Sequence, residues 1–180
     1  MSEKEAFTLF ISSTDKISGT NNNGQYNINW DDFLPRGYNF FKMTFNFQTS
    51  GGYYKDFTGN VFAAGKIVFN TGGKSHSFDT KTMSQSNTIG YIQRDIQTSA
   101  SSSNTLSCFF SFNSPKTISR PNQNVVTISI YNTCTTTATN NLLVDTNAAG
   151  TALTGDMNNW NMIIQFVPID DSIQPNHVNF

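Results

Sequence analysis

The stretch "NFFKMTFNFQT", residues 39–49, gives the clearest signal of the fold because its apolar and polar side chains alternate. Successive side chains of an extended chain point to opposite faces, so one face of this stretch is apolar and the other is polar. The apolar face carries Phe41, Met43, Phe45 and Phe47. This period of two predicts a β-strand with one buried face.

Similar runs, bounded by turn residues, recur along the chain. No stretch holds the 3.6-residue apolar stripe of an amphipathic helix, so the chain is predicted to be all-β. The predicted strands cover residues 6–13, 25–30, 39–49, 65–71, 76–80, 89–97, 105–112, 124–131 and 159–169. Among the connectors, the Asn23-Gly24 pair suits a tight turn. The longest interruption, residues 133–158, is unusual in a compact domain, although "NNLLVD" within it could add a short edge strand.

Period two also assigns the side chains that face the core. They are Phe7, Leu9, Ile11, Met43, Phe45, Phe47, Ile67, Phe69, Leu106, Cys108, Phe110, Phe112, Val126, Ile128, Ile130, Trp160, Met162, Ile164 and Phe166. Antiparallel strands of this kind in two packed sheets make a β-sandwich, most economically a single jelly roll of about eight strands. An immunoglobulin-like sandwich is the alternative. We expect one domain over residues 1–180, with a short N-terminal arm and a C-terminal tail.

The charge content is low. Only 13% of the residues are charged, and the formal net charge is -1, so no bulk charge attracts nucleic acid or an acidic membrane. The surface must therefore consist mainly of Ser, Thr, Asn and Gln. Removing water from such a surface when a partner binds costs little free energy. The 16 phenylalanines exceed what one small core needs, so some are expected to face a neighbour.

No segment has the apolar length that crosses a bilayer, and no secretory signal is evident, so we expect synthesis in the cytoplasm.

Residues suited to catalysis or metal binding are scarce. His76 lies in a predicted hairpin and His177 in the tail, and no pair of His or Cys has metal-ligand spacing. The acidic pairs at residues 31–32 and 170–171 resemble charged strand ends. We therefore expect a protein that is not an enzyme, with no catalytic residue, metal or cofactor.

The two cysteines are expected to differ in environment. Cys108 is in phase with Leu106 and Phe110, which predicts a buried free thiol, whereas Cys134 lies in the long loop.

Aromatic residues offer a second class of function. Trp30, Tyr53, Tyr54 and Trp160 are of the types that stack on sugars. Trp160 is in phase with the core, and Trp30 ends a predicted strand. A carbohydrate-binding or host-attachment module, with a glycan as partner, is therefore an alternative, although no clear row of outward aromatics supports it.

Several segments resemble a known family in order and spacing. They are "FTLFISSTDKISGT", "FLPRGYNFFKMTFNFQTSGGYYKD", "NTIGYIQRDIQ", "RPNQN" and "NWNMIIQFVPID". Together they resemble the single jelly-roll minor capsid and penton proteins of large icosahedral double-stranded DNA viruses and their virophage relatives. The resemblance implies a structural virion protein that touches neighbouring capsid proteins, and a penton would form a pentamer at the vertices. The family has no catalytic residues to carry over, and the chain is too short for the two fused jelly rolls of a major capsid protein.

Three aromatic residues are the predicted assembly contacts. Tyr53 and Tyr54 follow Gly51-Gly52, and adjacent strand residues face opposite ways, so at most one of the two can be in the core. The other, together with Phe180 at the end of the tail, is predicted to contact a neighbouring subunit. We expect self-association, with a pentamer favoured and a trimer possible. A trimeric jelly-roll ligand of the tumour-necrosis-factor type is the third alternative.

Overall fold

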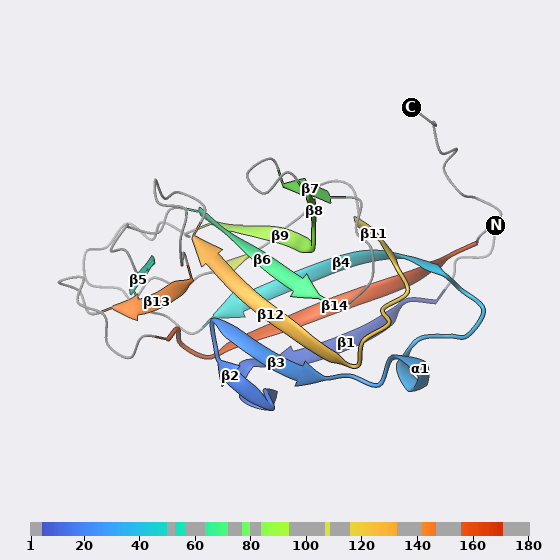
Figure 1. Cartoon of the computed structure of the whole chain (residues 1–180), viewed down its shortest axis with the longest axis horizontal. Coiled ribbons are helices and arrows are strands. Elements are labelled where there is room, and N and C mark those ends of the chain that lie inside the picture. Colours follow the sequence, from blue (N-terminus) through green and yellow to red (C-terminus); the bar gives the residue numbers. More distant parts are fainter. Residues whose placement is uncertain are drawn as a thin grey trace.

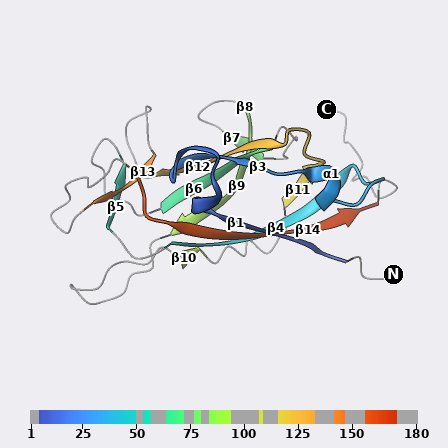
Figure 2. The same cartoon turned by 90° about the horizontal axis from the view of Figure 1, so that it is seen from below.

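The computed structural model describes residues 5–49, 53–56, 64–71, 77–79, 84–93, 107–108, 116–132, 142–146 and 156–170. These residues form an antiparallel β-sandwich, and Figure 2 shows its two layers edge-on. The expected all-β sandwich is therefore confirmed.

The first sheet has the strand order β1 (Phe7–Ser12), β14 (Trp160–Ile169), β4 (Phe40–Thr49) and β10 (Ser107–Cys108). A further strand, β11 (Lys116–Ser119), pairs with β4 as well. Since β14 occupies one edge of β4 along its whole length, β10 and β11 share the other edge.

The second sheet has the order β2 (Ser18–Thr20), β3 (Asn23–Asn27), β12 (Val125–Asn132), β6 (Ala64–Asn70) and β9 (Thr88–Gln93). Two small sheets complete the described strands. One pairs β5 (Tyr53–Asp56) with β13 (Leu143–Thr146), and the other pairs β7 (Ser77–Asp79) with β8 (Ser84–Ser86). Figure 1 shows β5 and β13 at one end of the sandwich and the one-turn helix α1 (Trp30–Phe33) toward the other.

The order of the strands is that of a jelly roll. The chain passes from β1 to β3, β4 and β6 by crossing between the two sheets each time, makes one connection within the second sheet from β6 to β9, and then crosses again to β10, β12 and β14. Four strands of the first sheet, β1-β14-β4-β10, thus face four of the second, β3-β12-β6-β9. This order could not be read from the sequence.

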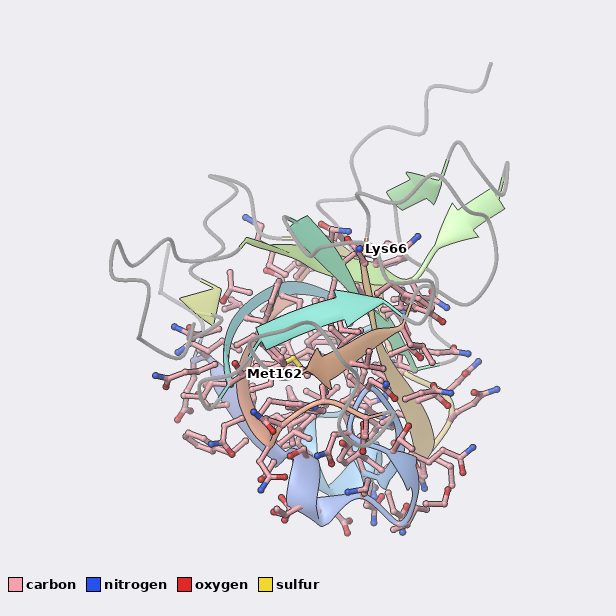
Figure 3. All side chains as sticks on the ribbon, turned by 90° about the vertical axis from the view of Figure 1, so that its left-hand side faces the viewer. Lys66 and Met162 are labelled. Atoms are coloured by element: carbon pink, nitrogen blue, oxygen red, sulfur yellow. The ribbon has the colours of Figure 1, made fainter. Side chains whose placement is uncertain are left out.

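Among the described residues, alternation places the core as predicted, whereas Leu106, Phe110 and Phe112 lie outside them. The buried apolar side chains of the two sheets include Met43, Phe47, Ile67, Phe69, Val126, Ile128, Ile130, Trp160, Met162, Ile164 and Phe166. Phe7, Leu9 and Phe45 are partly buried and pack against this cluster. Figure 3 looks along the sandwich and shows Met162 among the packed interior side chains, with Lys66 at the outside of the second sheet.

Two local predictions were wrong. The turn of the first hairpin lies at Asn21-Asn22, whereas Asn23 and Gly24 belong to β3. The predicted strand over residues 25–30 ends at Asn27, because the chain then turns through α1, in which Trp30 is the first residue.

Other predictions fall partly outside the described residues. The predicted strand 105–112 is described only as Ser107–Cys108, where the backbone of Cys108 pairs with that of Phe47. The placement of the Cys108 side chain, and the whole of Cys134, lie outside the described part. Within the long interruption, β13 confirms that the segment around "NNLLVD" adds a short strand.

Candidate interaction surface

The outer face of the first sheet is almost uncharged. It is formed by the alternate residues of β1, β14 and β4 that point away from the core: Thr8, Phe10, Ser12, Asn161, Ile163, Gln165, Val167, Lys42, Thr44, Asn46 and Gln48. Lys42 is the one charged residue of this set. A partner that covers this face has few ions to strip of water.

Two large apolar side chains stand out on this face. Phe10 is 71% exposed and Ile163 is 39% exposed. The register of β1 and β14 places them directly opposite each other, so their Cβ atoms are about 5 Å apart. On its other side, Ile163 lies opposite Asn46 of β4. The pair therefore forms a small apolar centre with a polar, uncharged rim, which is the usual anatomy of a protein interface.

The outer face of the second sheet has no such pair among its described residues. One aromatic residue of this face, Tyr131, is half-buried, and the Lys66 ammonium lies 5.9 Å from the centre of its ring. The Ser129 hydroxyl donates to the side-chain oxygen of Asn23 at 2.7 Å. Val125 is exposed, but it sits singly at the start of β12. Lys66 and Ser129 on this face thus have partners within the chain.

The predicted assembly residues lie elsewhere. Tyr53 and Tyr54 are in β5, where their backbones pair with Thr146 and Asp145 of β13. They occupy successive strand positions at one end of the sandwich (Figure 1). Their side chains, and the whole of Phe180, lie outside the described residues.

Sequence reasoning missed Phe10 and Ile163, although the signal was present. Phe10 is out of phase with Leu9 and Ile11, and Ile163 is out of phase with its neighbours on β14. In a strand with one buried face, an apolar residue on the polar side has no role in the core. The register adds what the sequence lacked, because it brings the two exceptions together.

Both tryptophans are core residues. Trp30 is 2% exposed and Trp160 is 1% exposed. Their indole N–H groups donate to backbone oxygens, that of Trp30 to Gln123 at 2.9 Å and that of Trp160 to Asn21 at 2.7 Å. Neither indole is available to stack on a sugar, so the predicted sugar platform loses both tryptophans.

One polar cluster fixes the corner between the sheets. The Asp156 carboxylate accepts hydrogen bonds from the backbone N–H groups of Asn21 at 2.8 Å, of Asn22 at 2.9 Å and of Met157 at 2.8 Å. The Asn22 side chain donates to the backbone oxygen of Leu143 at 2.8 Å. Because these bonds satisfy backbone groups of the turn, the cluster has a structural role: it stabilises the contact between the Asn21-Asn22 turn and the segment before β14.

A second polar cluster ties α1 to the segment before β12. Arg120 donates to the backbone oxygen of Pro35 at 2.9 Å and pairs with the Asp31 carboxylate at 3.0 Å. Asp31 belongs to the acidic pair predicted to mark a strand end, and it lies instead in the first turn of α1. Asp31 is largely exposed, so the ion pair contributes little to stability.

Among the described residues, two titratable groups have pKa values shifted by burial. Burial raises the pKa of the Tyr26 hydroxyl, with smaller contributions from Asp15 and Asp156, so this group stays neutral. Burial lowers the pKa of Lys116, whose ammonium donates to the backbone oxygen of Thr88 and so joins β11 to β9. Within the described ranges, no group of three or more His, Cys, Asp or Glu residues gathers where a metal ion could bind.

A scan against protein-family models, a search of curated proteins and a search of solved structures each return no match for this chain. Among the residues that the structure describes, no helix has the length and apolar character needed to span a membrane.

Proposed function

We propose that this chain is a structural virion protein, a minor capsid or penton subunit that acts through contacts between subunits. It would be made in the host cytoplasm and assembled into the capsid. The observation that carries the proposal is the exposed Phe10–Ile163 pair at the centre of an uncharged sheet face. The jelly-roll order of the strands and the resemblance of five sequence segments to single jelly-roll capsid proteins also support it.

The physical argument concerns the cost of desolvation. A shell subunit must bury surface against several neighbours, and each buried ion costs free energy unless it is paired. A face of Ser, Thr, Asn and Gln side chains around Phe10 and Ile163 avoids most of this cost. An aromatic anchor at the centre of an interface contributes about 2 kcal/mol or more.

The partners are other copies of the chain and neighbouring capsid proteins. A ring of five copies is favoured, as expected for a penton, and a trimer is the alternative. Tyr53, Tyr54 and Phe180 are further candidates for such contacts.

The oligomer mass of the purified full chain tests this proposal. Light scattering and electron microscopy should reveal closed rings with five times the chain mass of 20.0 kDa. Three variants separate folding from assembly: Tyr53→Ala, Tyr54→Ala and a chain truncated after Asp171. In each, the melting temperature should stay close to that of the wild type, whereas the fraction of assembled protein should fall.

Two results would overturn the proposal. One is a wild-type chain that stays monomeric at high concentration and binds glycans, which is the behaviour of a carbohydrate-binding module. The other is a trimer that binds a cell-surface receptor, which is the behaviour of a jelly-roll ligand.

A further inference from the structure

Strand β1 is a sheet edge that is capped only at its last residue among the described contacts, where the Ser12 backbone N–H donates to the Asp15 carboxylate at 3.2 Å. Its six residues, "FTLFIS", contain no charge and no proline, and its register with β14 runs unbroken from Phe7 to Ser12. Among the described strands, β14 is its one pairing partner. A regular, uncharged edge strand presents backbone N–H and C=O groups to any chain that can pair with it.

The other sheet edges differ from β1. Strand β2 has three residues, and Gly19 at its centre has a positive φ of 84°. Strand β9 has a register irregularity opposite Ile67 and Val68 of β6. The edge beyond β4 is divided into β10 and β11, which are two and four residues long. Short, bulged or interrupted edges resist pairing, so β1 is the described edge best suited to accept another strand.

The sequence of β1 is self-complementary about Phe10. In "TLFIS", residues 8–12, a hydroxyl residue stands at each end, a branched aliphatic residue stands next to it, and phenylalanine is at the centre. If a second β1 runs antiparallel and is centred on Phe10, Thr8 lies opposite Ser12 of the other copy and Leu9 lies opposite Ile11. Such like-with-like pairs are favourable cross-strand neighbours. This symmetry argues for a second copy of the chain as the occupant.

We propose that two copies of this chain associate by antiparallel β1–β1 pairing centred on Phe10. Directly opposed residues of antiparallel strands share a face, so the two Phe10 rings meet on the outer face of the joined sheet. Each ring keeps Ile163 as its neighbour on β14, and the apolar row therefore runs Ile163, Phe10, Phe10, Ile163 across the two-fold axis. The contact is isologous, and it does not depend on the virion assignment.

Single cysteines test the register. In a chain with Cys108→Ala and Cys134→Ala, Phe10→Cys should give a disulfide-linked dimer under mild oxidation. The two Cα atoms would be about 4.5–5.5 Å apart, which is within the range of disulfides. Thr8→Cys alone and Ser12→Cys alone should give little dimer, because each residue would be about 13 Å from its own copy. An equal mixture of these two variants should form a mixed dimer.

A charge placed on the edge tests the contact without cysteines. Phe10→Lys should weaken dimer formation by about tenfold or more, because two ammonium groups would face each other across the axis. Val125→Lys is the matched control, since Val125 is also an exposed apolar strand residue but lies on the second sheet. Sedimentation velocity over a range of concentrations gives the association constants, and melting temperatures confirm that both variants fold.

The outcomes separate this proposal from the proposed function. A dimer that crosslinks at Phe10 but never forms a larger ring supports the β1 contact and removes the penton role. A pentamer that persists in Phe10→Lys and gives no Phe10→Cys crosslink overturns the β1 contact, and the penton role would then rest on other contacts, such as those proposed for Tyr53, Tyr54 and Phe180. Equal crosslinking at Thr8→Cys and Phe10→Cys, or a wild type that is monomeric at all concentrations, also overturns the β1 contact.

Discussion

Phe166 and Ile163 lie three residues apart on β14 and face opposite sides of the first sheet. Phe166 is fully buried, and its ring centroid lies 5.8 Å from that of Trp30, 5.9 Å from that of Phe33 and 6.4 Å from that of Phe41. Ile163 is partly exposed beside the more exposed Phe10. One sheet therefore carries two kinds of apolar residue, one that the fold needs and one that it does not use.

The largest effect on stability is expected at the inner face. Phe166→Ala should lower the free energy of unfolding by about 3–5 kcal/mol, because it leaves a cavity beneath several aromatic rings. Urea denaturation of the purified protein measures this change. A loss below about 1 kcal/mol would contradict the assignment of the two faces.

A smaller loss of stability is expected from a substitution where the two sheets are in contact. A Cβ atom on Gly90 of β9 would lie 2.0 Å from Cζ and 2.1 Å from Cε1 of the Phe45 ring on β4. Gly90→Ala should therefore cost about 1–3 kcal/mol through overpacking. A shorter side chain in Phe45→Leu should make room, so the double variant should lose less than the sum of the two single losses. Additivity within about 0.5 kcal/mol in a double-mutant cycle would show that the two residues do not contact.

Removing the Asp156 hydrogen bonds should lower the free energy of unfolding by a similar or smaller amount than Gly90→Ala does. Asp156→Ala removes the acceptor of the Asn21 and Asn22 backbone N–H groups, and leaving such groups without a partner costs about 1–3 kcal/mol. Asp156→Asn keeps one carbonyl oxygen and should restore part of the loss. Thermal unfolding of the two variants should rank them in this order, and equal losses would argue against the hydrogen bonds as the cause.

Replacing Lys116 should change the free energy of unfolding by a still smaller amount, and this change should depend on pH. Burial holds the pKa of its ammonium below the ordinary value of 10.5, so the unfolded chain binds this proton at pH values where the folded chain has released it. This group therefore lowers stability at neutral pH, and the penalty disappears as pH rises through the lowered pKa toward 10.5. The difference in unfolding free energy between wild type and Lys116→Met should shift in favour of the wild type over that range. A difference that is flat with pH would contradict the shift.

The sequence predicted the sandwich because alternation is a local signal. Each inner-face residue from Met43 to Phe47, and from Trp160 to Phe166, could be assigned from its immediate neighbours. The strand order needed contacts between residues far apart in the chain, such as the pairing of β1 with β14. No local pattern encodes such a pairing.

Misplaced elements have equally specific causes. Asn23-Gly24 suits a tight turn, but the turn lies at Asn21-Asn22, where Asp156 holds both backbone N–H groups from a distant part of the chain. At Gly24, a Cβ atom would lie 3.0 Å from the Tyr26 hydroxyl oxygen, so close packing explains this glycine better than a turn does. Long-range contacts have overridden a local preference.

The candidate surface was only half visible in the sequence. Phe10 and Ile163 could each be recognised as out of phase, but their juxtaposition depends on the register of β1 and β14. The sequence instead indicates Tyr53 and Tyr54, which follow two glycines. Their role as contacts stays a prediction.

The smallest effect on stability should accompany the largest effect on assembly. The double variant Phe10→Ser/Ile163→Ser removes both apolar side chains from the outer face, and exposed substitutions of this kind usually change the unfolding free energy by about 0.5 kcal/mol or less each. Val125→Ser is the control on the other sheet. Multi-angle light scattering across a range of concentrations should show assembled wild type and control, whereas the double variant should remain a folded monomer with a nearly unchanged melting temperature. A double variant that assembles as the wild type does would contradict the claim that this face joins one subunit to another.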